Sequence, residues 1–159
     1  MTSGVPSPDR PSPRRALARR GVLVGALALG GLTAARWYNI GGILENGALS
    51  VTDAHSAALS GDITLIDIRR PDEWARTGVP EGALPLDMRD PDFTQRLLEM
   101  VPDKSAPIAL ICARGVRTRA LAKRLTDAGF SNIIDVPEGM LGSGAGPGWL
   151  TSGLPVTGL

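Results

Sequence analysis

The residues best suited to chemistry lie in one short segment, residues 112–118, which read Cys-Ala-Arg-Gly-Val-Arg-Thr and include the only cysteine of the chain. The segment separates an apolar run from an amphipathic stretch, so we expect Cys112 between a buried strand and a helix N-terminus. A thiolate there faces unpaired N–H groups and the positive end of the helix dipole, and nearby arginines add positive charge. Gly115 permits a tight turn that would aim several N–H groups at one centre. The pattern predicts a nucleophilic cysteine in an anion-binding loop.

The elements that would position this loop alternate along the chain. Predicted strands cover residues 63–66, 83–86, 108–111 and 133–136, and predicted helices cover 53–59, 93–100 and 119–128, with a brief one from Pro71. This alternation indicates an α/β fold with a central parallel sheet flanked by helices on both faces. Ligands of such sheets bind beyond the carboxyl ends of the strands. Asp67, Cys112 and Glu138 each follow a predicted strand, and we expect them at that edge.

Three segments in order resemble the rhodanese family. Residues 112–118 have its loop of Cys, four residues and Arg, with Gly third after Cys and Thr following. Residues 67–69 (Asp-Ile-Arg), 73–74 (Glu-Trp) and 80–83 (Pro-Glu-Gly-Ala) are similar to its early signature, although the usual Gly-His before the proline is absent. Residues 149–156 begin with Trp and end with Gly-Leu-Pro-Val, similar to its closing signature. The resemblance implies a rhodanese-like domain over residues 47–157.

The resemblance also implies sulfur transfer. In rhodaneses the cysteine takes a sulfane sulfur from a small anionic donor such as thiosulfate, becomes a persulfide, and passes the sulfur to a thiol or cyanide acceptor. Cys112 would be the catalytic nucleophile. The substrate would be held by the loop residues that follow it, which are Ala113, Arg114, Gly115, Val116 and Arg117. This chemistry requires no cofactor and no metal.

Individual side chains around the loop have expected roles. Arg114 is the better candidate to contact substrate. Arg117 either binds the donor or pairs with Asp67 to hold the loop. Asp67 accepts hydrogen bonds that support the loop, and Arg69 belongs to the same support.

Four further features lie outside the loop. Glu138 either lines the pocket or is a solvated loop carboxylate, and the long glycine-rich segment 139–148 should border the pocket. We expect His55 at the surface, and Trp149 as a core anchor for the final segment.

Two other functions fit the same loop. The domain could be a sulfur carrier or a partner-binding module without turnover. A cysteine phosphatase or arsenate reductase is disfavoured, because related folds place five residues between Cys and Arg for those oxyanions. Here four residues separate Cys112 from Arg117, which makes the cradle tighter.

The N-terminal region differs in composition from the rest of the chain. Residues 1–20 carry five Arg and one acidic residue, a charge of +4, whereas the remainder carries 12 basic and 15 acidic residues, a charge of −3. A basic tip on a mildly acidic body is not typical of a nucleic-acid binder. We therefore expect residues 1–36 to be a separate basic leader that is disordered at its start.

The leader has the layout of an export signal. Arg19-Arg20 resembles a twin-arginine motif, the apolar run 21–35 follows, and small residues at 33–35 offer a cleavage site. An uncut run would instead associate with the membrane, although its 15 residues fall short of the roughly 20 that span a bilayer. A third alternative is a helix packed on the domain. With either a signal or an anchor, we expect the domain outside the cytoplasm, as in a periplasm.

Overall fold

The computed structural model describes residues 47–158. The predicted leader 1–36 and its membrane association through 21–35 lie outside the described residues. Between residues 47 and 158, no helix is both long and apolar enough to cross a membrane.

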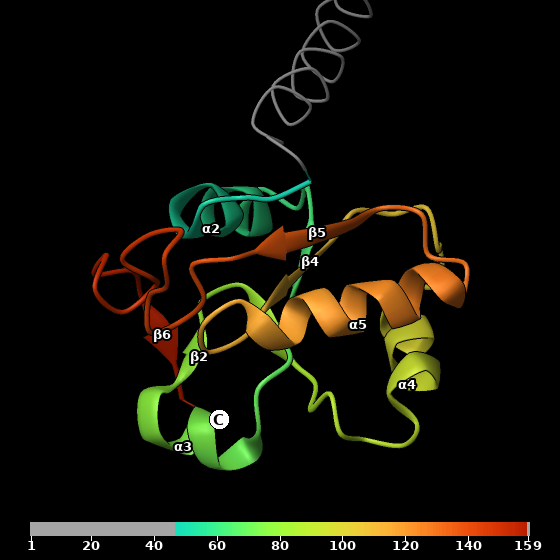
Figure 1. Cartoon of the computed structure of the whole chain (residues 1–159), viewed down its shortest axis with the longest axis horizontal. Helices are drawn as coiled ribbons and strands as arrows, with labels where there is room; N and C mark the ends of the chain where they lie inside the picture. The colour runs from blue at the N-terminus through green and yellow to red at the C-terminus, as the bar shows by residue number, and fades with distance from the viewer. Residues whose placement is uncertain (1–46, 159) are drawn as a thin grey trace, which may run out of the picture. The chain divides into compact units, whose positions relative to one another are not determined.

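A parallel sheet of four strands forms the centre of the fold (Figure 1). Its strands are β1 (Thr64–Asp67), β3 (Ala83–Pro85), β4 (Ile108–Ile111) and β5 (Ile133–Val136), arranged in the order β3-β1-β4-β5. Every residue of β4 is buried, as expected for a central strand that is covered on both faces. A separate antiparallel pair, β2 (Val79–Pro80) with β6 (Val156–Thr157), ties the C-terminal segment to the chain just after α3 (Pro71–Thr77).

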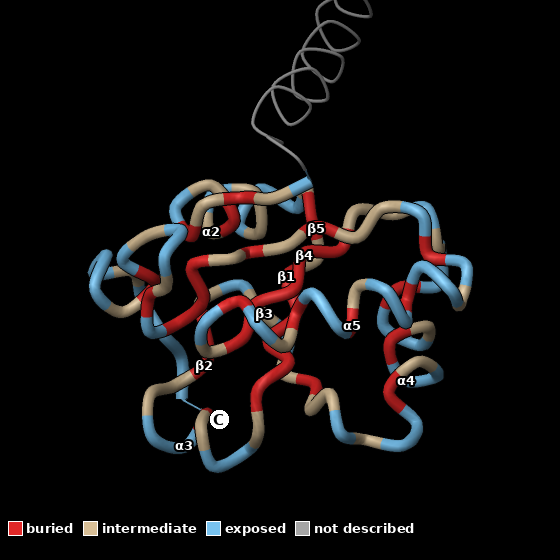
Figure 2. Tube along the Cα trace, in the orientation of Figure 1, coloured by how far each residue is buried: buried red, intermediate tan, exposed pale blue. Residues whose placement is uncertain are grey.

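Helices and loops cover both faces of the sheet, and each face has its own apolar core. Figure 2 shows that the central strands are largely buried. On one face, α4 (Phe93–Met100) and α5 (Val116–Asp127) pack against alternate residues of β1 and β4. On the other face, α2 (Val51–Leu59) and the segment around Met140 and Trp149 cover the remaining strand residues. The predicted α/β fold, with its parallel sheet and helices on both faces, is confirmed.

The starts of two helices differ from their predicted positions. Helix α2 begins at Val51, because the Ser50 hydroxyl accepts a hydrogen bond from the Asp53 N–H at 3.1 Å and caps the helix in place of Thr52. Helix α5 begins at Val116, three residues earlier than predicted, with Gly115 as its N-cap in a left-handed conformation. The cysteine therefore lies only four residues before the first helical residue.

Candidate active site

The cysteine loop, residues 112–117, connects the end of β4 to the first turn of α5. Gly115 has φ +75°, and its main-chain N–H donates a hydrogen bond to the Cys112 Sγ at 3.2 Å. The Thr118 hydroxyl donates to the Gly115 carbonyl at 2.8 Å and fixes the turn. The loop thus directs a main-chain donor at the sulfur, which favours negative charge there.

Further donors in the loop have no partner. Among residues 47–158, the main-chain N–H groups of Ala113, Arg114, Val116 and Arg117 make no hydrogen bond. The first N–H groups of a helix have no acceptor within the helix, and an anion can bind them. The predicted anion-binding loop therefore has its donors available.

The glycine-rich segment contacts the loop main chain to main chain. Met140 N–H donates to the Cys112 carbonyl and Leu141 N–H to the Ala113 carbonyl, both at 2.9 Å. A Cβ at Gly115 would lie 2.3 Å from the Pro137 carbonyl oxygen, and a Cβ at Gly139 would lie 2.6 Å from Ala113. Both glycines also have positive φ, so this close approach excludes any side chain. The segment was expected beside the site, and its first residues hold the cysteine loop.

The Cys112 side chain is 1% exposed and belongs to the apolar core shared with α4 and α5. A cavity of about 620 Å³ lies nearby at the carboxyl edge of the sheet, and Cys112 is not in its wall. Leu86 belongs both to that wall and to the core that contains Cys112. Cys112 is thus almost fully enclosed, and the cavity lies on the same face of the sheet.

Arg117 pairs with Glu73, which corrects the predicted pairing with Asp67. Its two terminal nitrogens donate to the two Glu73 carboxylate oxygens at 2.7 Å each. The Arg117 hydrogen bond is the main reason that the pKa of Glu73 falls from 4.5 to about 2. The same hydrogen bond is the largest cause that raises the pKa of Arg117, which also lies close to Cys112. A bidentate pair with α3 therefore fixes the arginine beside the cysteine.

Asp67 pairs with Arg69 in a second bidentate interaction. The Arg69 side chain is 2% exposed and the Asp67 side chain is 0% exposed. Arg69 also donates to the Thr77 hydroxyl and the Gly78 carbonyl, both at 2.7 Å. These bonds join the end of β1 to the end of α3. The predicted grouping of Asp67 and Arg69 is correct in geometry, but their contacts reach α3 and not the cysteine loop directly.

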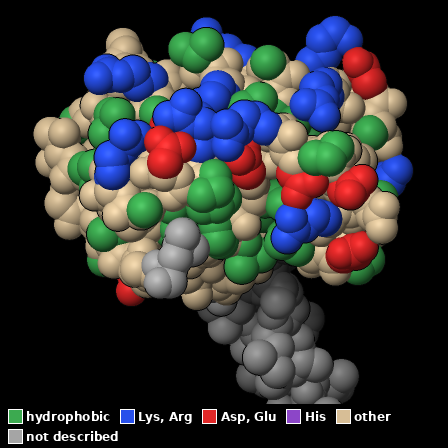
Figure 3. Space-filling view, turned by 90° about the horizontal axis from the view of Figure 1, so that it is seen from below, with side chains coloured by type: hydrophobic (Ala, Val, Ile, Leu, Met, Phe, Trp, Pro, Cys, Tyr) green, Lys and Arg blue, Asp and Glu red, His purple; other side chains and the backbone are tan. Residues whose placement is uncertain are grey.

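Arg114 and Val116 are exposed on the outer side of the loop, and Val116 is 74% exposed. Figure 3 shows Lys and Arg side chains gathered over part of the face seen from below, with acidic side chains beside them. Arg114 is therefore accessible from solvent, and its contact with substrate stays a prediction.

Three predicted side-chain environments can be compared with the structure. Glu138 is 6% exposed and accepts hydrogen bonds from the N–H groups of Val51 and Gly148 at 3.1 Å each. The expected solvated carboxylate is therefore wrong, because Glu138 is buried and joins α2 to the glycine-rich segment. His55 is not a surface residue: its side chain is 15% exposed and its Nε2 lies 2.9 Å from Glu81. Trp149 is fully buried, which confirms it as a core anchor.

Glu73 is the functional neighbour that sequence reasoning missed. In the sequence it is only part of the acidic–aromatic pair of the early signature, 44 residues from Arg117. The one available signal was its position in the first turn of a short helix that follows β1. Helices placed after neighbouring parallel strands meet at the same edge, but their pairing requires the fold.

No group of three or more potential metal-ligating side chains occurs among the residues that the structure describes.

Comparison with known proteins places the chain in a family. The rhodanese-like domain family matches residues 50–142. An uncharacterised protein of Rickettsia rickettsii is 28% identical over 116 residues, which span 65% of this chain and 91% of that relative. The fold is similar to that of the polysulfide-sulfur transferase homodimer of Wolinella succinogenes (TM-score 0.55, 27% identity, 80% and 90% of the two chains). It is also similar to a thiosulfate sulfurtransferase of Pseudomonas aeruginosa (TM-score 0.54, 23% identity, 68% of this chain and 19% of that chain). The chain belongs to the rhodanese-like domain family.

Proposed function

We propose that this protein is a sulfurtransferase that carries a sulfane sulfur as a persulfide on Cys112. The observation that supports this most directly is the Gly115 N–H, which donates to Sγ at 3.2 Å within a loop of otherwise unpartnered amides. Such donors stabilise negative charge on the sulfur and on the group that leaves it. The similarity to a protein described as a polysulfide-sulfur transferase supports the same chemistry.

The first half-reaction conserves atoms and charge. The Cys112 thiolate attacks the outer sulfur of thiosulfate, a new S–S bond forms, and the S–S bond of the donor breaks with its electron pair on sulfite. The product is the Cys112 persulfide anion. In the second half-reaction an acceptor thiol bonds to the outer sulfur, and the Cys112 thiolate leaves. The covalent intermediate replaces one difficult transfer by two easier steps.

Arg117 acts as a positioning residue in this scheme. Glu73 neutralises its charge and holds its guanidinium, so the arginine braces the loop beside the sulfur. Arg114, exposed and unpaired among residues 47–158, is the candidate to attract the anionic donor.

A sulfur-carrier or partner-binding module is the second candidate, and the burial of Cys112 favours a partner-binding module, which does not need the thiol to react. Cys112 is 1% exposed, so little of it is open to a donor from solvent. A cysteine phosphatase remains disfavoured by the four-residue spacing of the loop, since a smaller ring of amides surrounds the sulfur.

Intact mass spectrometry tests the proposal. We expect the folded protein to gain the mass of one sulfur atom after incubation with thiosulfate, and to lose it when cyanide is added. A Cys112→Ser variant should gain nothing, while Arg124→Gln, an exposed change far along α5, should behave as wild type. No gain in the folded wild type, with a gain after partial unfolding, would identify Cys112 as a core residue. Faster turnover of an aryl phosphate than of thiosulfate would favour the phosphatase.

We further propose that the protein works outside the cytoplasm, on the basis of the twin-arginine-like leader in residues 1–36. Cell fractionation with N-terminal mass analysis tests this. A processed N-terminus near residue 35 in the periplasmic fraction indicates cleavage, and an intact one in the membrane fraction indicates an anchor. An intact N-terminus in the cytoplasmic fraction would contradict export.

A further inference from the structure

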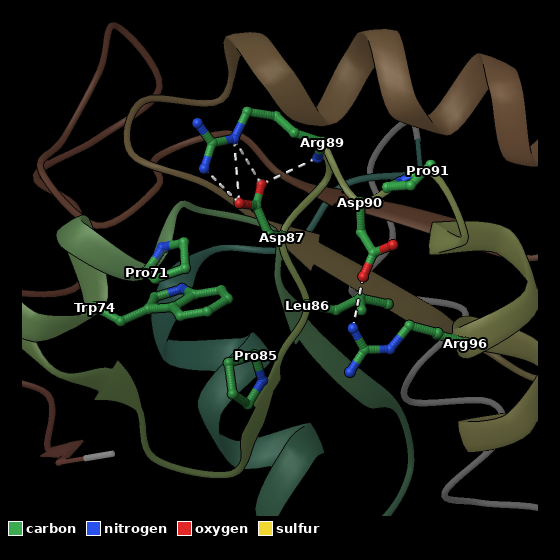
Figure 4. A pocket seen from close by; sticks show the side chains of 9 residues that line it. All are labelled: Pro71, Trp74, Pro85, Leu86, Asp87, Arg89, Asp90, Pro91 and Arg96. Atoms are coloured by element: carbon green, nitrogen blue, oxygen red, sulfur yellow. Dashed lines mark hydrogen bonds and ion pairs between the residues drawn. The ribbon is translucent and has the colours of Figure 1, made fainter.

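The main chain compensates the carboxylate of Glu138, in contrast to the carboxylates around the cavity. Figure 4 shows that each carboxylate of the cavity pairs with an arginine, Asp87 with Arg89 and Asp90 with Arg96. Glu138 is 6% exposed and makes no ion pair within the described part of the chain. A buried carboxylate without a cation must be compensated by hydrogen-bond donors, and here these donors are main-chain N–H groups.

The two oxygens of Glu138 accept hydrogen bonds from two separate segments. Oε1 accepts from the Val51 N–H at the start of α2, and Oε2 accepts from the Gly148 N–H at the end of the glycine-rich segment, at 3.1 Å each. The start of a helix favours a negative charge, so a carboxylate suits the first turn of α2. Because both partners are donors, an amide at this position would turn its NH2 group toward one of them. This position therefore requires a carboxylate.

The glycine-rich segment packs directly on this carboxylate. A Cβ at Gly146 would lie 2.6 Å from the Glu138 Cδ and Oε2 atoms. A Cβ at Gly148 would lie 2.1 Å from the main-chain nitrogen of Gly142, so the two ends of the segment also contact each other. A Cβ at Gly144, in contrast, would have no described atom within 4 Å. Glu138 is therefore enclosed by one part of the segment and not by its tip.

A series of main-chain hydrogen bonds connects Glu138 to the cysteine loop. The Trp149 N–H, next along the chain from the N–H that Glu138 binds, donates to the Gly139 carbonyl at 2.9 Å. The following residue of the segment, Met140, donates its N–H to the Cys112 carbonyl at 2.9 Å. Glu138 therefore holds one end of a series of contacts whose other end is the main chain of the nucleophile.

We infer that Glu138 is a positioning residue for sulfur transfer at Cys112. This inference rests on the proposed function. The Glu138 carboxylate holds the glycine-rich segment, the segment holds the Cys112 carbonyl, and the loop so held directs the Gly115 N–H at the sulfur. Glu138 carries no sulfur and no proton in the reaction. Because placement of the reacting group affects the transfer step itself, its loss should lower the maximal rate and not the affinity for the donor.

Two glycine substitutions test this inference without removing the carboxylate. Gly146→Ala places a methyl group against the Glu138 carboxylate, which must shift because it is the flexible end of its side chain. Gly144→Ala adds the same methyl group to the same segment in open space, and neither glycine has a positive φ. In single-turnover loading, we expect Gly146→Ala to lower the maximal rate about tenfold and to change the half-saturating thiosulfate concentration by less than about twofold. Gly144→Ala should match wild type in both.

Glu138→Gln and Ser50→Ala separate positioning from stability. Glu138→Gln leaves one N–H donor without an acceptor, and Ser50→Ala removes the hydroxyl that caps the same first turn of α2. We expect both changes to lower the urea midpoint, and only Glu138→Gln to lower the maximal loading rate, about tenfold, in protein that circular dichroism shows to be folded. Hydrogen exchange at the Met140 N–H, followed by NMR, should become about tenfold faster in Glu138→Gln and Gly146→Ala and should not change in the two controls.

Equal maximal loading rates in Gly144→Ala and Gly146→Ala would overturn the inference, and so would an equal loss of rate in Ser50→Ala and Glu138→Gln. If Glu138→Gln does not fold, the two glycine variants still decide the question. Failure of this inference leaves sulfur loading of the wild type intact, whereas failure of the proposed function abolishes it. In that second case, hydrogen exchange at the Met140 N–H still shows whether Glu138 holds the main chain beside Cys112.

Discussion

Two arginine–carboxylate pairs lie at the carboxyl edge of the sheet, and they differ in burial and in what they connect. Asp67–Arg69 is almost fully buried, and Arg69 also donates to Thr77 and to the main chain of Gly78. Glu73–Arg117 is partly exposed, at 13% and 29% of the two side chains, and it joins α3 to the first turn of α5. The first pair attaches α3 to the sheet, and the second uses α3 to brace the cysteine loop. Burial thus separates a pair required for folding from one available to function.

The largest expected effect comes from Arg69→Gln. This change leaves the Asp67 carboxylate buried without its counter-charge, so we expect the free energy of unfolding to fall by about 3–5 kcal/mol. Urea denaturation followed by circular dichroism measures it. The double variant Asp67→Asn, Arg69→Met should recover part of the loss, because it removes the uncompensated charge. A loss below about 1 kcal/mol in the single variant would remove the distinction between the two pairs.

Arg117→Gln should have the opposite balance of effects. The pair is partly solvated, so we expect a stability loss of about 1 kcal/mol. The rate of sulfur loading from thiosulfate should fall about tenfold, because the loop loses its brace beside the sulfur. Urea denaturation and single-turnover mass spectrometry measure the two quantities. Unchanged loading together with a large stability loss would make this pair equivalent to Asp67–Arg69.

Glu73→Gln tests the Glu73–Arg117 pair through the pH dependence of the unfolding free energy. The pKa of Glu73 is lowered to about 2 from an ordinary value of 4.5, mainly by the Arg117 hydrogen bond. Its ionised form therefore stabilises the fold fully above about pH 4.5, and that contribution is lost as pH falls toward 2. We expect the difference in unfolding free energy between wild type and Glu73→Gln to shrink over this window. A difference that does not change with pH would contradict the assignment.

The smallest effect should come from an exposed pair outside the site. Lys123 and Asp127 lie one turn apart on α5, with side chains 79% and 64% exposed. We expect Lys123→Gln to change the unfolding free energy by at most about 0.5 kcal/mol and to leave sulfur loading unaltered. The same urea and mass assays apply. A larger effect would mean that burial does not rank the ion pairs of this protein.

Local patterns predicted much of the fold. Helix 93–100 and strands 108–111 and 133–136 have the predicted bounds, because each apolar run is short and ends at a change of pattern. The position of Cys112 between strand and helix followed from the same patterns. These features depend on residues that are close together in the chain, so the sequence alone is enough to predict them.

Contacts between distant segments could not be predicted in the same way. From the sequence, Arg117 could pair with Asp67 or bind the sulfur donor. Its actual partner, Glu73, can be identified only when the fold brings α3 and α5 together at one edge of the sheet. His55 is largely covered because Trp149 and Glu81, from two other segments, contact it. The burial of Cys112 itself depends on helices α4 and α5 and on Leu86. Each case required the tertiary packing.

The main-chain contact between Gly115 and Pro137 constrains how this scaffold could be redesigned. Adding a fifth residue between Cys112 and Arg117, to widen the ring for phosphate, would push the turn into the Pro137 carbonyl. An engineer would have to rebuild residues 137–141 at the same time, since they donate to the carbonyls of the loop. Changes of reaction type in this architecture should therefore require paired alterations in two segments, and single insertions should yield misfolded protein more often than new enzymes.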